Sequence, residues 1–371
     1  MTFLDYIKNS FSRVLVVDTE FRFDSSMTIP QHVVCFVYKD VFTGETFRYW
    51  ENDKKSLGTP HFDYDDCLII SFNATAENGC YLNLLHGIPG NQWDVYVENA
   101  RLYKSIRTGK GSLTLLTTAD YYGVKDVMTK EYKTECINLI IENTSYTLPE
   151  QKKILDYCED DVRITADVFI KQVADIEKKL SLEEKDYHRE LQQIMRRGYA
   201  VGCVARVEKT GIPIDLPLVN KFNENWDQVK DKLIKTYNKS INVFDEDNTL
   251  LDEKFDAFVV REGLSNYWPK LNSGKYKKDK KTVSRFAERN DNVKTFQRIK
   301  SYLNMSRLTA YEPGFDGRVR ASINMFGTIT GRASPSTSKY PLNAGKWFRN
   351  MIKPSWEIIF ITWITKVRNP R

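Results

Sequence analysis

The stretch Val14 to Asp24, "VLVVDTEFRFD", places two carboxylates immediately after four apolar, mostly β-branched residues. A short apolar run of this kind is typical of a buried strand. Because residues i and i+2 of a strand share a face, Asp18 and Glu20 are expected to project together from the carboxyl end of that strand. An acidic pair at such a place is more often a solvated turn than a metal site, so its role depends on the rest of the chain.

Two later stretches carry carboxylates in comparable positions. Asn73 follows the apolar run "LIISF", and Glu77 lies four residues further on, near the start of a predicted helix. The plainer interpretation of that pair is a capping asparagine and a first-turn acid stabilised by the helix dipole. In "YCEDDVR", Tyr157 and Asp161 are spaced i to i+4 and therefore share a helix face. The plainer interpretation there is an acidic surface helix, with Cys158 in the core.

In their order along the chain, these three sets resemble the exonuclease motifs of the DEDD superfamily, tyrosine subclass. The motifs are Asp-x-Glu closing the first strand, Asn-x-x-x-acid opening a middle helix, and Tyr-x-x-x-Asp in a late helix. This superfamily includes the proofreading domains of DNA polymerases, and the resemblance covers residues 10–175. It implies a ribonuclease-H-like sheet, two divalent ions (Mg²⁺ or Mn²⁺), and removal of nucleotides from a 3′ end.

The same resemblance implies a role for each residue. Tyr157 would orient the attacking water or help to deprotonate it. Phe21, Phe72 and Asn73 would line the bound terminal nucleotide, with core packing as the equal alternative for the two phenylalanines. Glu77 departs from the more common aspartate by one methylene, which alters its reach and not its charge. The implied metal ligands are Asp18, Glu20, Glu77 and Asp161.

The two halves of the chain carry opposite charge. Residues 1–180 contain 20 Lys+Arg and 27 Asp+Glu, whereas residues 181–371 contain 35 and 22. A basic half with the run "KYKKDKK" (Lys275 to Lys281) suits a polyanion, although a solvated lysine-rich loop is the alternative. No apolar run approaches the roughly 18 residues that span a bilayer, so we expect a cytoplasmic protein without a membrane partner. The six scattered cysteines support neither a zinc site nor disulfides.

Periodicity predicts an α/β fold for the first half, a mixed sheet with flanking helices. We expect a hairpin over residues 32–50, a strand and helix within 67–85, a strand over 93–100, helical structure from 112, and a long helix over 148–173. The second half is predicted to be mainly α-helical. Its helices are expected from residue 181 to the Gly-Tyr-Ala-Val-Gly stretch at 198–202, over 219–240, and over 282–302.

The second half carries a further resemblance. "MRRGYAVGCVARVEKTGIPID" resembles the entry to the thumb of family A DNA polymerases, the bacterial DNA polymerase I type. "DGRVRASINMFGTITGRASPS" and "KWFRNMIKPSW" resemble the segment that precedes the first catalytic aspartate of that family's palm, after a Gly-Arg-Val hairpin. The resemblance implies contacts to the primer–template backbone, which carry no sequence information, from Thr330, Arg332 and Ser334.

The family's palm strand ends in a metal-binding aspartate, but "WEIIFITWITKVRNPR" contains none, and Thr362 stands at about that place. Nucleotide addition is not expected without metal carboxylates, because they stabilise the charge of phosphoryl transfer. Residues 357–371 are interpreted as a divergent or truncated tail, produced by a frameshift or an interruption. The alternative is that a separate chain supplies the missing palm and fingers.

The sequence therefore predicts an exonuclease domain over residues 1–178, followed by an incomplete polymerase thumb and palm entrance over 179–356. The expected function is metal-dependent 3′–5′ DNA exonuclease activity of the proofreading, phage-like kind, acting on single-stranded 3′ ends and primer–template in the cytoplasm of a bacterial or phage-infected cell. Two alternatives stay open. One is an RNA 3′ exonuclease, because no residue is seen to read the 2′-hydroxyl. The other is a non-catalytic DNA-binding remnant of a polymerase.

Overall fold

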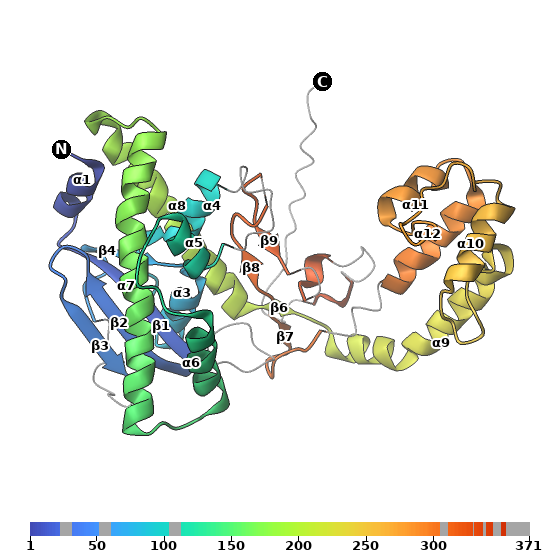
Figure 1. The fold of residues 1–371 in the computed structure, drawn as a ribbon. Helices are drawn as coiled ribbons and strands as arrows, with labels where there is room; N and C mark the ends of the chain where they lie inside the picture. The colour runs from blue at the N-terminus through green and yellow to red at the C-terminus, as the bar shows by residue number, and fades with distance from the viewer. Residues whose placement is uncertain are drawn as a thin grey trace. The chain divides into compact units, whose positions relative to one another are not determined.

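The computed structural model describes residues 1–22, 32–51, 61–103, 113–304, 311–328, 330–336, 339–343 and 350–353. The predicted tail at 357–371, including Thr362, lies outside the described residues. Within them the chain forms a mixed α/β region followed by a mainly helical one, which confirms the predicted fold class (Figure 1). None of the described helices is long and apolar enough to cross a membrane.

A five-stranded sheet has the strand order β3-β2-β1-β4-β5. Strand β1 pairs antiparallel with β2 and parallel with β4, while β2 and β3 form the predicted hairpin. Strand β5 extends the parallel side beyond β4. The strands are β1 (Arg13–Arg22), β2 (His32–Asp40), β3 (Thr46–Trp50), β4 (Cys67–Ser71) and β5 (Gln92–Asp94).

Both faces of β1 are buried, which explains why its sequence is a continuous apolar run. Val14 and Val16 belong to the hydrophobic cluster on the face that α7 (Leu148–Lys179) covers. Leu15 and Val17 belong to a second cluster on the opposite face, together with residues of α3 (Thr75–Asn83). Strand periodicity therefore directs the even-numbered positions, and with them Asp18 and Glu20, toward α7.

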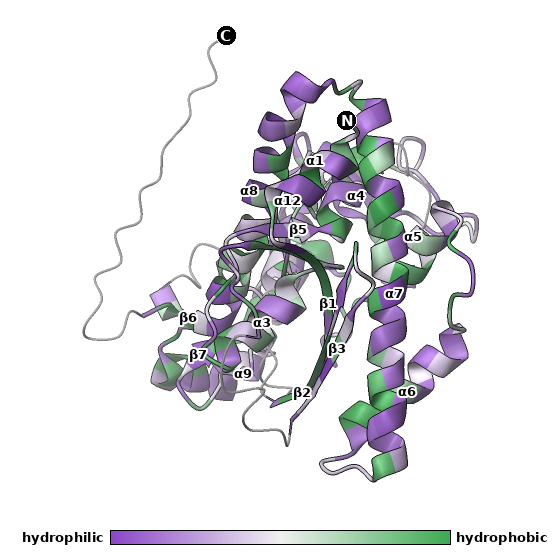
Figure 2. Ribbon diagram, turned by 90° about the vertical axis from the view of Figure 1, so that its left-hand side faces the viewer, coloured by the Kyte–Doolittle hydropathy of each residue, from purple (hydrophilic) through white to green (hydrophobic). Residues whose placement is uncertain are grey.

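The 32-residue helix α7 is the main helical partner of the sheet. It begins at a capping box between Thr147 and Glu150, with Pro149 in its first turn, so the predicted start is confirmed. Figure 2 shows α7 running beside the sheet, with hydrophilic and hydrophobic residues alternating along it as expected of a helix with one buried face. The other helices of this region are α1 (Phe3–Ser10), α4 (Val95–Tyr103), α5 (Leu115–Tyr121) and α6 (Lys130–Glu142).

The predicted strand over residues 93–100 is largely wrong. Strand β5 ends at Asp94, and helix α4 begins at Val95. The physical reason is the Asp94 carboxylate, which accepts the backbone N–H of Val97 at 3.0 Å and so satisfies a donor of the first helical turn. A β-rich composition is thereby overridden by a local cap.

The helix expected to begin at residue 181 was predicted to end at residues 198–202, which is also wrong. Helix α8 (Glu184–Thr210) continues through Gly198 and Gly202. Gly198 and Gly202 lie one turn apart on the face that meets β5 and the loop before it. A Cβ at Gly198 would lie 2.2 Å from the carbonyl oxygen of Gln92, and one at Gly202 would lie 2.5 Å from Ile88 Cγ2. These glycines permit close packing of α8 and do not end it.

Backbone contacts divide the chain into two compact units. Of the described residues, those between 1 and 211 and between 320 and 336 form the first unit, and those between 212 and 319 and between 339 and 353 form the second. The first unit therefore extends past the domain boundary predicted at residue 178, because α8 packs on α3 and β5. It also includes β8 (Ile323–Asn324) and β9 (Ser334–Pro335), which pair antiparallel around the Thr-Gly-Arg stretch.

The second unit is mainly helical, with α9 (Leu216–Ile241), α10 (Asp252–Arg261), α11 (Lys280–Ala287) and α12 (Asp291–Asn304). The single helix predicted over 282–302 is two helices, because the Asn290 side chain accepts the N–H of Val293 and starts α12. The Gly-Arg-Val stretch forms no hairpin with its sequence neighbours in the described residues. Instead β7 (Arg318–Val319) pairs with β6 (Ile212–Pro213), more than a hundred residues earlier.

Candidate active site

Strand β1 delivers the first carboxylates. Asp18 and Glu20 lie on one face of the strand near its carboxyl end, both half-buried, with an irregularity in the β1–β2 pairing just after Glu20. The thiol of Cys158, on the facing helix α7, donates to Asp18 Oδ2 at 3.5 Å. The sequence therefore places both carboxylates where strand periodicity predicts.

The connection from β4 to α3 delivers Asn73 and Glu77. Asn73 has a left-handed backbone with φ of 67° and is not the capping residue; Ala74 precedes the helix and has no side-chain cap. The Asp94 carboxylate instead accepts the backbone N–H groups before the helix, that of Asn73 at 3.3 Å and that of Ala74 at 3.0 Å. Glu77 follows one turn later, 3% exposed, and its Oε2 has no hydrogen-bond partner among the described residues.

Helix α7 delivers Tyr157 and Asp161, which are 2% and 5% exposed. The acids between them point elsewhere, as helical spacing predicts. Arg48 forms an ion pair with Glu159, and Arg163 lies 3.4 Å from Asp160. Cys158 and Val162 are fully buried in the core.

These three elements meet at one cavity of about 260 Å³. All five predicted catalytic positions line it, together with the three residues predicted to hold the nucleotide. Apart from Thr19, the rest of its wall is apolar, and Ile141 on α6 is 55% exposed there. The lining residues are Asp18, Thr19, Glu20, Phe21, Phe72, Asn73, Ala76, Glu77, Ile137, Ile140, Ile141, Tyr157 and Asp161.

Burial dominates the electrostatics of this cavity. Burial, with a further contribution from the nearby Asp161 carboxylate, raises the pKa of Asp18 to about 7. Burial also raises the pKa of Glu20 and of Glu77, each with an added contribution from Asp18. Buried carboxylates held this close resist ionisation, and the Lys133 ammonium offsets this only in part, so the site is electrostatically prepared for cations.

The donor set fits a divalent ion. Asp18, Glu20 and Cys158 each offer one ligand atom within 4.8 Å of the others. Asp161 Oδ1 and Glu77 Oε2 are buried without a hydrogen-bond partner among the described residues, although buried polar atoms are normally satisfied. Carboxylate oxygens are the ligands that Mg²⁺ and Mn²⁺ prefer.

The sequence did not reveal two further residues of the site, Lys133 and Asp94. Lys133 on α6 donates to Asp161 Oδ2 at 2.6 Å, and its Nζ lies 5.3 Å from the centre of the Tyr157 ring. The acidic neighbours, Asp161 first, raise the pKa of Lys133 against the opposing effect of burial. The available signal for Lys133 was weak, a lysine on the same helical face as Ile137 and Ile140. Asp94 was hidden inside the predicted strand.

The Thr-Gly-Arg residues do not join this cavity. Thr330 and Arg332 are exposed in the β8–β9 turn, and Ser334 is half-buried at the start of β9. The Thr328 hydroxyl accepts the N–H of Arg332 at 2.9 Å and organises that turn. Asn324 in β8 donates to the Tyr96 hydroxyl at 3.0 Å, so the hairpin is attached to α4.

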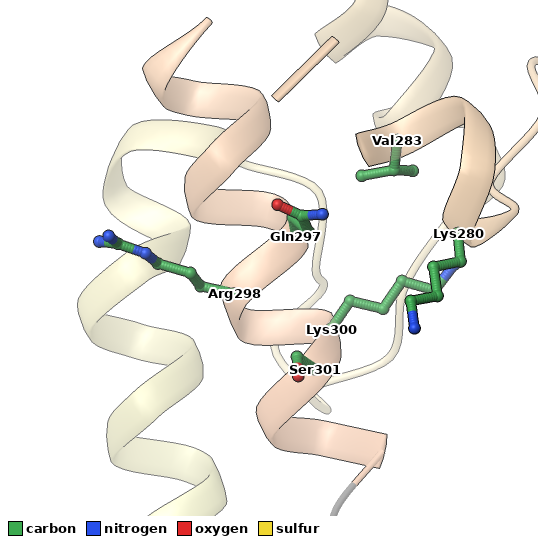
Figure 3. Close-up of a pocket in the computed structure, with 6 residues that line it drawn as sticks. All are labelled: Lys280, Val283, Gln297, Arg298, Lys300 and Ser301. Atoms are coloured by element: carbon green, nitrogen blue, oxygen red, sulfur yellow. The ribbon is translucent and has the colours of Figure 1, made fainter. Parts of the chain in front are cut away.

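The second unit contains a basic pocket of about 380 Å³ between α11 and α12. Figure 3 shows Lys280 from α11 and Lys300 from α12 extending on the same side of it, while Arg298 points away. Burial and then the charge of Lys300 lower the pKa of the neighbouring Lys278. The pocket is lined by Lys280, Val283, Gln297, Arg298, Lys300 and Ser301. Such crowding of cations suits an anionic ligand.

No known protein family matches the chain, and no curated protein matches it either. A solved structure is similar: the POL domain of Pol1 from M. smegmatis in complex with DNA primer-template and dNTP, with a TM-score of 0.57 and 12% identity. The match covers 94% of this chain and 56% of that one, so the chain spans little more than half the length of its structural neighbour. At this identity the likeness shows the fold alone, and the fold of this chain is similar to that of a DNA polymerase region.

Proposed function

We propose that this chain is a metal-dependent 3′–5′ DNA exonuclease of the proofreading type, joined to a family A-like polymerase thumb and palm entrance. The observation that carries the proposal is the convergence of Asp18, Glu20, Glu77, Tyr157 and Asp161, from three separate elements, on one cavity. Two-metal hydrolysis of a phosphodiester needs several carboxylates at one point. The similarity to a polymerase fold supports a nucleic-acid substrate.

The apolar wall of the cavity suits the terminal nucleotide. Phe21 and Phe72 are half-buried, and Ile137 and Ile141 are exposed at the same cavity. Apolar and aromatic faces stack on any base, so they accept a 3′ end regardless of its sequence. Asn73 adds a polar group beside them. The pocket therefore suits an unpaired terminal nucleotide.

The acidic side of the cavity suits the reaction itself. Divalent ions, when bound, would activate water and offset the charge that develops on the phosphate. Asp18, Glu20, Glu77 and Asp161 would hold them, while the Tyr157 hydroxyl, on the same helix face as Asp161, would orient the water. The oxygen of that water would attack phosphorus as the water gives up a proton. The bond from phosphorus to the 3′ oxygen would break, and the 3′ oxygen would take up a proton. The products are a nucleoside 5′-monophosphate and a strand shortened by one nucleotide.

Digestion of a 5′-labelled single-stranded DNA oligonucleotide with Mg²⁺ or Mn²⁺ tests this function. We expect a ladder that shortens from the 3′ end, and a loss of about two orders of magnitude or more in Asp18→Ala and Asp161→Ala, because each removes a ligand. The matched control is Asp160→Ala, which removes the same charge one residue away, where the carboxylate faces Arg163.

Three outcomes would contradict the proposal. Equal digestion rates for Asp161→Ala and Asp160→Ala would mean that the hydrolysis does not depend on the cavity carboxylates. Faster digestion of a matched RNA would favour an RNA exonuclease. Salt-dependent DNA binding without turnover, by folded protein with either metal, would favour a non-catalytic binding role.

A further inference from the structure

The hairpin formed by β8, β9 and the turn between them packs on the connection that carries part of the cavity wall. Met325 and Phe326, in that turn, belong to one hydrophobic cluster with Ala74. Ala74 directly follows Phe72 and Asn73, which line the acidic cavity. The hairpin is therefore separated by one layer of side chains from the wall that we assign to the terminal nucleotide.

Tyr96, in the first turn of α4, makes a second connection between the hairpin and the cavity. Its ring meets the ring of Phe72 edge-on, with 6.0 Å between the two ring centres. Its hydroxyl accepts a hydrogen bond from the Asn324 side chain of β8 at 3.0 Å. Since the same cavity wall is joined to the hairpin in two places, the position of the hairpin beside the cavity is fixed by packing and by a hydrogen bond.

The turn of this hairpin presents two exposed polar side chains, Thr330 and Arg332. Between them, Gly331 has a φ of 76°, and a Cβ there would lie 3.5 Å from Cδ1 of the Phe326 ring. The Thr328 hydroxyl accepts the backbone N–H of Arg332, and the Thr328 N–H donates to the Arg332 carbonyl at 3.2 Å. The backbone of the turn is thus held against Phe326, while a guanidinium and a hydroxyl face the solvent.

Resting on the function proposed above, we infer that the Thr-Gly-Arg turn binds the single strand that leads into the acidic cavity, and not a primer–template duplex. The terminal nucleotide lies against Phe72 and Asn73, and the nucleotides before it cross the hairpin, where Thr330 and Arg332 contact phosphates. The cavity carboxylates repel the phosphates of an approaching strand, so a cation attached to the cavity wall favours binding. Such contacts position a strand of any sequence, as removal of nucleotides from a 3′ end requires.

Digestion of oligonucleotides of two lengths tests the inference. Arg332→Gln should raise the KM for a single-stranded octanucleotide by about tenfold, because a charged hydrogen bond to a phosphate is lost. The effect should shrink to less than about twofold for a dinucleotide, which is too short to reach the hairpin. Arg332→Lys keeps the charge and should recover part of the loss. The matched control is Arg206→Gln, which removes an exposed arginine of α8.

Binding without metal, measured by fluorescence anisotropy in EDTA, gives a readout that does not depend on turnover. In Arg332→Gln, the slope of log affinity for single-stranded DNA against log salt should become less steep by about 0.7, the contribution of one phosphate contact in a single strand. The affinity for a primer–template duplex should change less than the affinity for the single strand.

Weaker binding of the duplex, with single-strand binding unchanged, would overturn the inference and would make the turn a primer–template contact. An equal loss on the dinucleotide and the octanucleotide would also overturn it, because the substitution would then disturb the cavity itself. Digestion with an unchanged KM for the octanucleotide would overturn this inference alone. Single-strand binding that depends on Arg332, without digestion by the wild-type chain, would overturn only the exonuclease proposal.

Discussion

At the scale of single residues, Asp94 shows how a side chain outside the proposed chemistry can shape the site. Its carboxylate accepts three backbone N–H groups, those of Asn73, Ala74 and Val97. It thereby ends β5, starts α4 and holds Asn73 in a left-handed conformation that non-glycine residues seldom adopt. Glu77 lies one helical turn after Asn73, so its position also depends on the contacts of Asp94.

Asp94→Ala should lower the free energy of unfolding by about 2–4 kcal/mol, because buried N–H groups lose their acceptors. Asp94→Asn should recover part of the loss, since Oδ1 is the atom that accepts from both Asn73 and Val97. Denaturant titration measures both values. Asp120→Ala, an exposed aspartate on α5, is the control, and an equal stability for Asp94→Ala and this control would contradict the role assigned to Asp94.

At the scale of elements, α8 joins distant parts of the first unit. Its glycines let it approach β5, and Glu208 near its end accepts the N–H of Ile323 in β8 at 2.5 Å. Met325 and Phe326, in the turn after β8, pack with Val201 of α8. The Thr-Gly-Arg hairpin is thus part of the same compact unit as the acidic cavity.

Glu208 makes the stability of this unit depend on pH. Burial raises its pKa to about 7, well above the usual 4.5, so the folded chain binds this proton more strongly than the unfolded chain. The stabilisation is complete below about pH 4.5 and is lost as the pH rises through 7, by roughly 3 kcal/mol in total. Glu208→Gln keeps the acceptor for Ile323 and should lose less stability between these pH values.

Denaturant titration of the wild type and of Glu208→Gln at low and neutral pH measures how much stability each protein loses. The cavity carboxylates titrate in both proteins, so their contribution cancels in the comparison. An identical pH dependence for the wild type and Glu208→Gln would contradict the assignment. Glu183→Gln, near the start of α8 and exposed, serves as the control for the loss of an acid from this helix.

At the scale of the whole molecule, acidic and basic functions occupy different parts of the chain. The carboxylates gather in the first unit, and the pocket with Lys280 and Lys300 lies in the second. Under the proposed function, the first unit acts on the 3′ end, and the basic surface raises the local DNA concentration. Each phosphate contact adds salt dependence to such binding.

Replacing Lys280 and Lys300 together with alanine should weaken primer–template binding. The slope of log affinity against log salt should become less steep by about 1–2, since each lost phosphate contact contributes roughly 0.9. Fluorescence anisotropy over a salt series measures the slope. The matched control replaces Lys178 and Lys185, two exposed lysines of the first unit, and equal slopes in both double variants would refute a phosphate role for the pocket.

What the sequence determined by itself follows from local periodicity. The face shared by Asp18 and Glu20 and the face shared by Tyr157 and Asp161 depend only on strand and helix geometry, and both were predicted. The hairpin, the α7 start and the mixed α/β class were predicted for the same reason.

Tertiary structure alone decided features that depend on residues far apart in the sequence. The pairing of Lys133 with Asp161 spans 28 residues and needs α6 to lie against α7. The close packing of α8 at Gly198 depends on Gln92, and the backbone of Ala74 before α3 depends on Asp94, 20 residues later. Local propensity cannot anticipate these contacts, because their free energy comes from burial and hydrogen bonds that exist only once the sheet and helices have met.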